Sequence, residues 1–221
     1  MRWNHPELGT VSPGVFIPLF EENGLINRLD DYVWREVARQ IKIWKEEIGM
    51  TVPVSVNVSR IDLLSPNYEK NMLELIRDNS LQTGDMLLEI TESAYTENSE
   101  RIIEIANSLR ARGFKLEMDD FGSGYSSLNM LAALPIDALK LDMKFVRRIC
   151  ENAKDLRMVQ LMIDIAAFLN VPVIAEGVET EEQYRLLKEN GCDIIQGYYF
   201  SKPLTVDQFS EMIEKEGRKR C

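Results

Sequence analysis

The sequence predicts an α/β fold in which strands and helices alternate along the chain and build a parallel sheet. Short apolar segments rich in β-branched residues recur, which is the pattern of buried strands. Amphipathic stretches with helical spacing separate them, as in residues 98–112 and 153–169. Glycine or asparagine stands where several of these helices should end, at Gly113, Asn170 and Gly191. Repeated strand–helix units of this kind form parallel sheets with right-handed crossovers.

The chain is predicted to be a single domain, residues 1–221, with two parts. Residues 1–50 are predicted to form a helical lead-in, and residues 51–221 hold the repeated strand–helix units. No stretch has the composition of a linker or of a low-complexity segment. A chain of 221 residues is long enough for one large domain with a sizeable core.

Two helices are predicted within the lead-in from the residues at their ends. Ser12 as N-cap and Pro13 as first helical residue suit the start of a short helix that Gly24 ends. Asp30 is expected to cap a longer helix, which Gly49 closes. The apolar residues of the longer helix fall on one stripe, which is typical of a helix packed on a core.

Six strands are predicted in the rest of the chain, each short and apolar. The predicted strands are residues 52–58, 86–90, 114–118, 138–141, 171–175 and 193–199. Each of the first five is separated from the next by a segment long enough for a crossover connection, which parallel neighbours require.

Composition excludes several classes of function. The net charge is −10 and the pI is about 4.8, so a broad electrostatic contact with nucleic acid is not expected. No apolar run is long enough to cross a bilayer, and the start does not resemble a signal peptide. Cys150, Cys192 and Cys221 are far apart, which fits a reducing cytoplasm better than a disulfide framework. Because His5 is the only histidine, a mechanism that needs a histidine cluster is excluded.

Two adjacent carboxylates, Asp119 and Asp120, close the third predicted strand, and a glycine-rich turn follows. Neighbouring strand residues point to opposite faces, so both side chains reach one site only if the chain leaves the regular ladder at Asp120. Gly122 and Gly124 permit such a turn. Two like charges this close need neutralisation, for which a divalent cation is the usual partner. The motif by itself leaves a second interpretation open, in which Asp120 is an ordinary helix N-cap.

Polar side chains stand at or near the carboxyl end of every predicted strand. They are Asn57, Glu89, Glu92, Asp119, Asp120, Lys140, Asp142, Glu176, Glu179 and Gln196. Active sites of parallel α/β barrels form at this end of the sheet, and an oxygen-only ligand set favours magnesium or manganese over zinc or copper. Taken singly, Glu179 could open the next helix and Gln196 could be a core amide. A lysine within an apolar strand, such as Lys140, is rarely buried unpaired.

Taken together, these segments resemble the EAL domain family, the cyclic di-GMP phosphodiesterases of bacterial signalling. The matching segments run in family order over nearly the whole chain, which makes the resemblance specific. They are RWNHPELG at 2–9, SPGVFIPL at 12–19, NVS at 57–59, EITE at 89–92, DDFG at 119–122, KLD at 140–142, EGVE at 176–179 and QGY at 196–198.

The resemblance implies a TIM-type (β/α)8 barrel that hydrolyses cyclic di-GMP to linear pGpG with Mg²⁺ or Mn²⁺. By position, Asn57, Glu89 and Asp119 match metal ligands of the family. Asp119 matches the residue that bridges both ions, and Asp120 matches a ligand of the second. Two metal ions activate the attacking water and neutralise the phosphate, so no histidine or cysteine nucleophile is required.

The resemblance also implies roles for the remaining polar residues. Glu176 matches the proposed general base for the attacking water, and Lys140 matches a residue that contacts this water or the phosphate. Glu179 and Gln196 match supporting positions of the active site, which we assign to catalysis and to substrate binding, respectively. Arg2 matches a contact to a substrate phosphate.

Glu92 matches the glutamate that anchors the loop after Asp120, which in this family couples metal binding to dimerisation. The expected partners are therefore cyclic di-GMP and a second copy of the chain in a homodimer. Regulatory or cyclase domains are expected in a longer parent protein. Nucleic acid is not an expected partner, and no membrane segment is expected in this chain.

The sequence departs from the family pattern at its start. The Glu-x-Leu motif, whose glutamate is a ligand of the first metal in the family, should stand just before the residue preceding Arg2, and Met1 occupies that preceding place. The six predicted strands also fall short of the eight of a closed barrel. We therefore expect an incomplete barrel, a weakened first metal site and little or no hydrolysis by this chain. The alternatives to an enzyme are a cyclic di-GMP receptor that does not hydrolyse it and a dimerising interaction domain.

Overall fold

The main element of this computed structural model, which describes residues 3–96, 99–122 and 134–220, is a parallel sheet of six strands. The strands follow one another in sequence order, and every neighbouring pair is parallel, as predicted. Each overlaps one of the six predicted segments. They are β3 Val54–Asn57, β4 Met86–Thr91, β5 Lys115–Phe121, β6 Ala138–Leu141, β7 Val173–Ala175 and β8 Ile194–Ile195.

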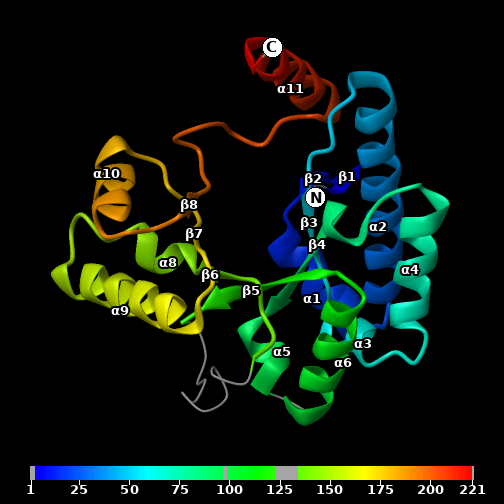
Figure 1. The fold of residues 1–221 in the computed structure, drawn as a ribbon, viewed down its shortest axis with the longest axis horizontal. Helices are drawn as coiled ribbons and strands as arrows, with labels where there is room; N and C mark the ends of the chain where they lie inside the picture. The colour runs from blue at the N-terminus through cyan, green and yellow to red at the C-terminus, as the bar shows by residue number, and fades with distance from the viewer. Residues whose placement is uncertain (1–2, 97–98, 123–133, 221) are drawn as a thin grey trace.

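Helices connect the successive strands and pack beside the sheet. They are α3 Arg60–Leu63, α4 Tyr68–Asp78, α5 Glu92–Thr96, α6 Ser99–Ala111, α8 Met143–Val146, α9 Ala153–Leu169 and α10 Glu181–Glu189, with the 3-10 turn η2 Thr83–Asp85 before β4. A last helix, α11 Val206–Arg220, follows β8. Figure 1 shows α8, α9 and α10 on one side of the row of strands and α4 on the other. None of the helices described is long and apolar enough to cross a membrane.

The first 50 residues contain a hairpin in addition to the predicted helices. Their elements are β1 Trp3–His5, β2 Gly9–Val11, α1 Pro13–Glu22, α2 Ile26–Ile43 and the π-helical turn η1 Trp44–Ile48. The antiparallel hairpin was not expected from the sequence, because its strands are too short to show a period. Its turn depends on local features: Gly9 has φ +67°, and the Nδ1 of His5 accepts the N–H groups of Glu7 and Leu8.

The predicted ends of these helices are largely confirmed. Ser12 is the N-cap of α1 with Pro13 as first helical residue, and Gly49 closes η1 in the left-handed region. The prediction that Asp30 caps the longer helix is wrong, because α2 begins four residues earlier, at Ile26. The carboxyl group of Asp30 instead forms a hydrogen bond with Asp62, and burial beside this second carboxyl raises the pKa of Asp30 to about 8.

The core lies along the middle strands. Met86, Leu88 and Ile90 of β4 are fully buried, and all four residues of β6 are buried, so helices or loops cover both faces of the sheet there. This is the arrangement that a parallel sheet requires, because its strands are hydrophobic on both faces.

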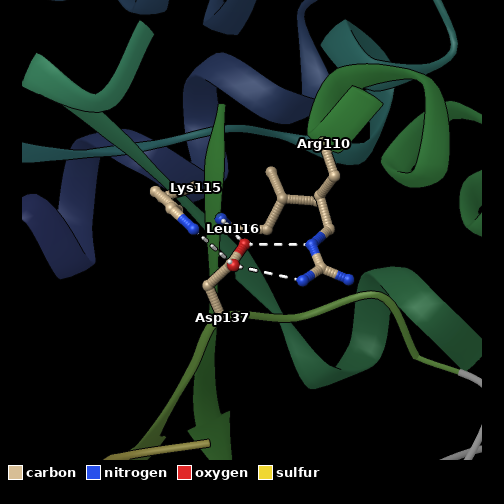
Figure 2. Close-up of polar contacts among 4 residues, drawn as sticks. All are labelled: Arg110, Lys115, Leu116 and Asp137. Carbon is tan, nitrogen blue, oxygen red and sulfur yellow. Dashed lines mark hydrogen bonds and ion pairs between the residues drawn. The ribbon is translucent and has the colours of Figure 1, made fainter. Parts of the chain in front are cut away.

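A charged cluster fixes the amino ends of β5 and β6 (Figure 2). Asp137, directly before β6, accepts hydrogen bonds from Arg110 Nε and Nη2 and from Lys115 Nζ, all at 3.1 Å, and from the N–H of Leu116 at 3.0 Å. Burial by itself would raise the pKa of Asp137, but these bonds outweigh burial and lower it. The cluster therefore joins α6 to two strands at the end of the sheet opposite to the polar strand ends.

Candidate active site

An open cavity of about 900 Å³ lies at the carboxyl ends of the strands, between β3 and the turn that follows β8. Of the predicted site residues, those that line it are Asn57, Glu89, Asp119, Lys140, Glu176 and Gln196. They come from six successive strands or from the residue directly after a strand. The structure therefore brings together, at one edge of the sheet, side chains that are up to 139 positions apart, between Asn57 and Gln196.

Lys140 is the centre of this cluster. Its side chain is 5% exposed, and its Nζ lies 2.5 Å from Glu89 Oε1, 2.6 Å from Glu176 Oε1 and 3.7 Å from Asp119 Oδ1. The expectation that a lysine in an apolar strand must be paired is confirmed. One ammonium faces three carboxylates, so the cluster carries more negative than positive charge.

The protonation of the cluster follows from burial and from this imbalance. Burial raises the pKa of Glu89 and of Glu176, although Lys140 acts in the opposite direction on both. Burial alone would lower the pKa of Lys140, but Glu89, Asp119 and Glu176 outweigh it and raise the pKa. The lysine is therefore held charged, while two of its carboxylate partners resist full ionisation.

The Asp119-Asp120 pair sits on an irregularity of β5. The register with β6 shifts between Met118 and Phe121, and Asp120 has φ +56°, which is unusual for a residue other than glycine. The prediction that the chain leaves the regular ladder at Asp120 is confirmed. Because Asp120 lies within β5, the alternative that it is a helix N-cap is wrong.

Asp120 is not among the described residues that line the cavity. Burial, followed by the charges of Asp119 and Asp142, raises the pKa of Asp120. Its backbone N–H donates to Asp119 Oδ1 at 2.9 Å, which fixes the orientation of the Asp119 carboxylate. The two aspartates are therefore electrostatically coupled.

Glu92 is buried, with 1% of its surface exposed, and its Oε2 accepts the N–H of Gly122 at 2.9 Å. The glutamate therefore holds the first residue beyond β5. Gly122 has φ +93°, and a Cβ there would come within 2.1 Å of Met162 Cε. The remainder of this loop, including Gly124, lies outside the described residues.

Glu179 and Arg2 are the remaining predicted site residues. Glu179 is exposed, and it is not among the described residues that line the cavity. Its backbone, rather than its carboxylate, is held, because its N–H donates to Gln183 Oε1 at 2.8 Å. Arg2 lies outside the described residues.

Sequence reasoning missed two buried polar residues near the site. Glu117, two residues before Asp119 and on the same face of β5, is 6% exposed and accepts a hydrogen bond from Ser55 Oγ at 2.8 Å. Gln183 forms a capping box with Thr180 at the start of α10. The spacing of Thr180 and Gln183 is the signature of such a box and could have identified the second residue.

Comparison of the sequence with known proteins finds a matching family and similar curated proteins. The sequence model of the EAL domain family matches residues 1–203. The cyclic di-GMP phosphodiesterase NbdA of Pseudomonas aeruginosa is 37% identical over 213 residues, which are 96% of this chain and 27% of that protein. The cyclic di-GMP phosphodiesterase PdeR of Escherichia coli K12 is 35% identical over 215 residues, 97% of this chain and 32% of that protein. The chain thus spans about a quarter to a third of the length of these curated relatives.

Solved structures have the same fold. The PaMucR phosphodiesterase in complex with c-di-GMP superposes with a TM-score of 0.90 at 33% identity, covering 94% of this chain and 84% of that chain. The EAL enzyme Bd1971, bound to cAMP and cyclic di-GMP, superposes with a TM-score of 0.91 at 29% identity, covering 96% of this chain and 58% of that chain. The six-stranded sheet therefore corresponds to an incomplete TIM-type barrel, as predicted.

Proposed function

Because the chain belongs to the EAL domain family, we propose that it acts on cyclic di-GMP, as a metal-dependent phosphodiesterase that releases linear pGpG. The observation that carries this proposal is the convergence of Glu89, Asp119 and Glu176 on Lys140 at the floor of an open cavity. Relatives named as cyclic di-GMP phosphodiesterases support the same substrate.

The donor set fits Mg²⁺ or Mn²⁺ in its chemistry. Asn57, Glu89, Asp119 and Asp120 offer oxygen atoms alone, which these hard cations prefer. Burial is the largest cause that raises the pKa of Glu89 and of Asp120, and the charge of a bound cation would act in the opposite direction on both. Among the residues that the structure describes, no three acidic, histidine or cysteine side chains form a ready-made metal site. The fit of Mg²⁺ or Mn²⁺ to this site therefore rests on the chemistry of the oxygen ligands rather than on a preformed coordination geometry.

The chain's own residues have distinct tasks in the proposed reaction. Glu176, half-buried in the wall of the cavity, would accept a proton from the attacking water, for which a raised pKa is useful. Lys140, held charged, would stabilise the phosphate oxygens as they gain charge. Gln196 and Arg2 are proposed to bind the substrate, and Glu179 to support the catalytic turn. Bound metal ions would lower the pKa of the water and neutralise the phosphate.

The test is to incubate the protein with cyclic di-GMP and either Mn²⁺ or Mg²⁺, and to separate the products by ion-exchange chromatography. We expect pGpG to form slowly, because the Glu-x-Leu glutamate is not among residues 1–221. EDTA should stop the reaction, and Glu176→Gln should slow it by about 100-fold or more. Glu182→Gln, an exposed glutamate of α10, is the matched control and should react like the unchanged protein. Absence of both binding and cleavage would reject the proposed substrate.

A non-hydrolysing receptor for cyclic di-GMP is the second candidate. The contacts of Lys140 with Glu89 and Glu176 favour it, because the lysine partly neutralises the cluster without any metal ion. Isothermal titration calorimetry distinguishes the two functions: binding without cleavage in either metal supports the receptor.

Assembly and cellular context are also proposals. A homodimer is proposed because Glu92 anchors the start of the loop after β5, and light scattering after size-exclusion chromatography measures it. Regulatory or cyclase domains are proposed for a longer parent protein, since the relatives are three to four times longer than the matched segment. The three scattered cysteines favour a reducing compartment, the cytoplasm.

A further inference from the structure

The side chain of Gln183 connects three backbone segments near the candidate site. Its Oε1 accepts the N–H of Glu179 at 2.8 Å and the N–H of Thr180 at 3.0 Å, and its Nε2 faces the carbonyl oxygen of Arg147 at 3.4 Å. Gln183 is 7% exposed, so few water molecules compete for these bonds. A single buried amide therefore fixes the end of the turn after β7 to α10 and, more weakly, to α8.

The middle of the same turn is held from the other side. Val178 is fully buried; its N–H donates to Gln196 O at 3.2 Å, and its carbonyl accepts the N–H of Tyr199 at 3.0 Å. Gly197 lies against it so closely that a Cβ would come within 2.1 Å of Val178 O. Residues 176–180 are thus clamped between the turn after β8 and the amide of Gln183.

We propose that Gln183 is a positioning residue for Glu176. Gln183 does not line the cavity, so it acts through the backbone of residues 176–180. Gly177, with φ +71°, directly follows Glu176 and adds little stiffness of its own. The bonds of Gln183 restrict the turn and thereby keep the carboxylate of Glu176 within 2.6 Å of Lys140. The effect on cleavage rests on the proposed function, whereas the effect on the turn does not.

Gln183→Met tests the proposal, because methionine fills the same volume without an acceptor. Hydrogen exchange should accelerate at least about 10-fold at the amides of Glu179 and Thr180. Single-turnover cleavage with enzyme in excess should slow by about 10–100-fold, while the Kd for cyclic di-GMP changes less than about 2-fold. Gln183→Glu keeps the acceptor and suits this helix position, so it should restore both the protection and the rate.

Gln208→Met is the matched control. Gln208 Oε1 accepts the N–H of Thr205 at 3.0 Å in an equivalent box at α11, so its loss reproduces the removal of a helix cap away from Glu176. This variant should leave the cleavage rate and the exchange of residues 179–180 unchanged. If the unchanged protein neither binds nor cleaves cyclic di-GMP, the proposed function fails and the exchange data alone decide on Gln183. If Gln183→Met leaves the exchange unchanged, or leaves the rate of an active protein unchanged, the positioning role is wrong.

Discussion

The two ends of the sheet use charge in opposite ways. At the carboxyl end, one cation, Lys140, faces the carboxylates of Glu89, Asp119 and Glu176. At the amino end, one carboxylate, Asp137, is surrounded by two cations and a backbone N–H (Figure 2). The carboxyl end is left short of positive charge, whereas the carboxylate at the amino end has more than one counter-charge.

The pKa values record the same difference. Burial raises the pKa of Glu89 and Glu176 because one lysine does not compensate for it, whereas the donors around Asp137 outweigh burial and lower its pKa. An end of the sheet where carboxylates outnumber cations is suited to binding cations or to changing its protonation. An end where the carboxylate is fully paired is suited to stabilising the fold. Barrel enzymes divide their two faces in this way.

Removing the cation from the carboxyl end should produce the largest effect. Lys140→Met leaves three partly buried carboxylates without a counter-charge, and we expect a loss of about 3 kcal/mol in the free energy of unfolding at pH 8. For a chain of this length that corresponds to a decrease in Tm of about 6–12 °C. The loss should be smaller at pH 5, because protonation of Glu89 and Glu176 removes the repulsion.

Calorimetry at the two pH values measures the effect of Lys140→Met, with Lys70→Met as control. Lys70 belongs to an exposed pair with Glu74 at 3.9 Å, so its replacement should change Tm little at either pH. Mn²⁺ should recover more stability in Lys140→Met than in the unchanged protein, because a cation replaces the missing charge. An equal loss at pH 5 and pH 8 would contradict the charge imbalance at this end.

Removing the carboxylate from the amino end should have a smaller effect. Asp137→Asn weakens charge-assisted bonds to Arg110 and Lys115, and we expect a loss of about 2 kcal/mol at pH 7. The folded-state pKa of Asp137 is lowered, so its contribution is present above the unfolded-state pKa and is lost as the pH falls through the folded-state value. The unchanged protein and the variant should therefore become similar in stability in acid, as measured by urea unfolding.

If the amino end of the sheet serves stability alone, Asp137→Asn should leave function unaltered. Cyclic di-GMP binding and cleavage should match those of the unchanged protein at temperatures where both are folded. Asp78→Asn, which removes an exposed pair with Arg77, is the control for the loss of a surface carboxylate. A change of cleavage rate in Asp137→Asn alone would break the assignment of the two ends to stability and to chemistry.

The sequence was sufficient for the features that local pattern encodes. Apolar segments and their helical connections predicted the six strands. The adjacent Asp119 and Asp120, followed by glycines, predicted a departure from the ladder, which the φ of +56° at Asp120 confirms. The polar residues at the strand ends predicted a site at one edge of the sheet, because carboxyl ends of parallel strands meet there. The sequence did not show that Glu89 and Glu176 are the partners of Lys140.

Contacts between residues far apart in the sequence could not be predicted from such local patterns. The bond of Asp30 to Asp62 joins residues of α2 and α3, so Asp30 gave only the local signal of a helix cap. Gln183 likewise had a recognisable capping spacing, but its contact with Arg147 depends on how α8 packs. The hairpin at Trp3–Val11 is too short to have a period, and only its folded turn reveals it.

The pair of Asp30 and Asp62 offers the smallest of the predicted effects and extends the comparison to a third acidic group. Asn27 and Ser59 donate to Asp62, Glu21 adds further negative charge near Asp30, and the buried hydroxyl of Tyr68 has no hydrogen-bond partner among the described residues. No cation is among the causes that raise the pKa of Asp30 to about 8; burial is the largest of them, and the neighbouring carboxyl groups add to it. Burial therefore raises the pKa of Asp30 without an opposing lysine, unlike the pKa values of the carboxylates around Lys140.

A raised folded-state pKa means that stability is present below the unfolded-state value and is lost as the pH rises through about 8. Asp30→Asn keeps a donor for Asp62 and carries no charge, so it should be more stable than the unchanged protein at pH 8, by about 1 kcal/mol after allowance for solvent screening. Near pH 4 the two proteins should be equally stable. Asp31→Asn, which alters an exposed pair with Arg35, should leave the pH profile unchanged. Parallel pH profiles for Asp30→Asn and the unchanged protein would show that Asp30 is ionised in the folded state, and the deficit of positive charge would then be confined to the cluster around Lys140.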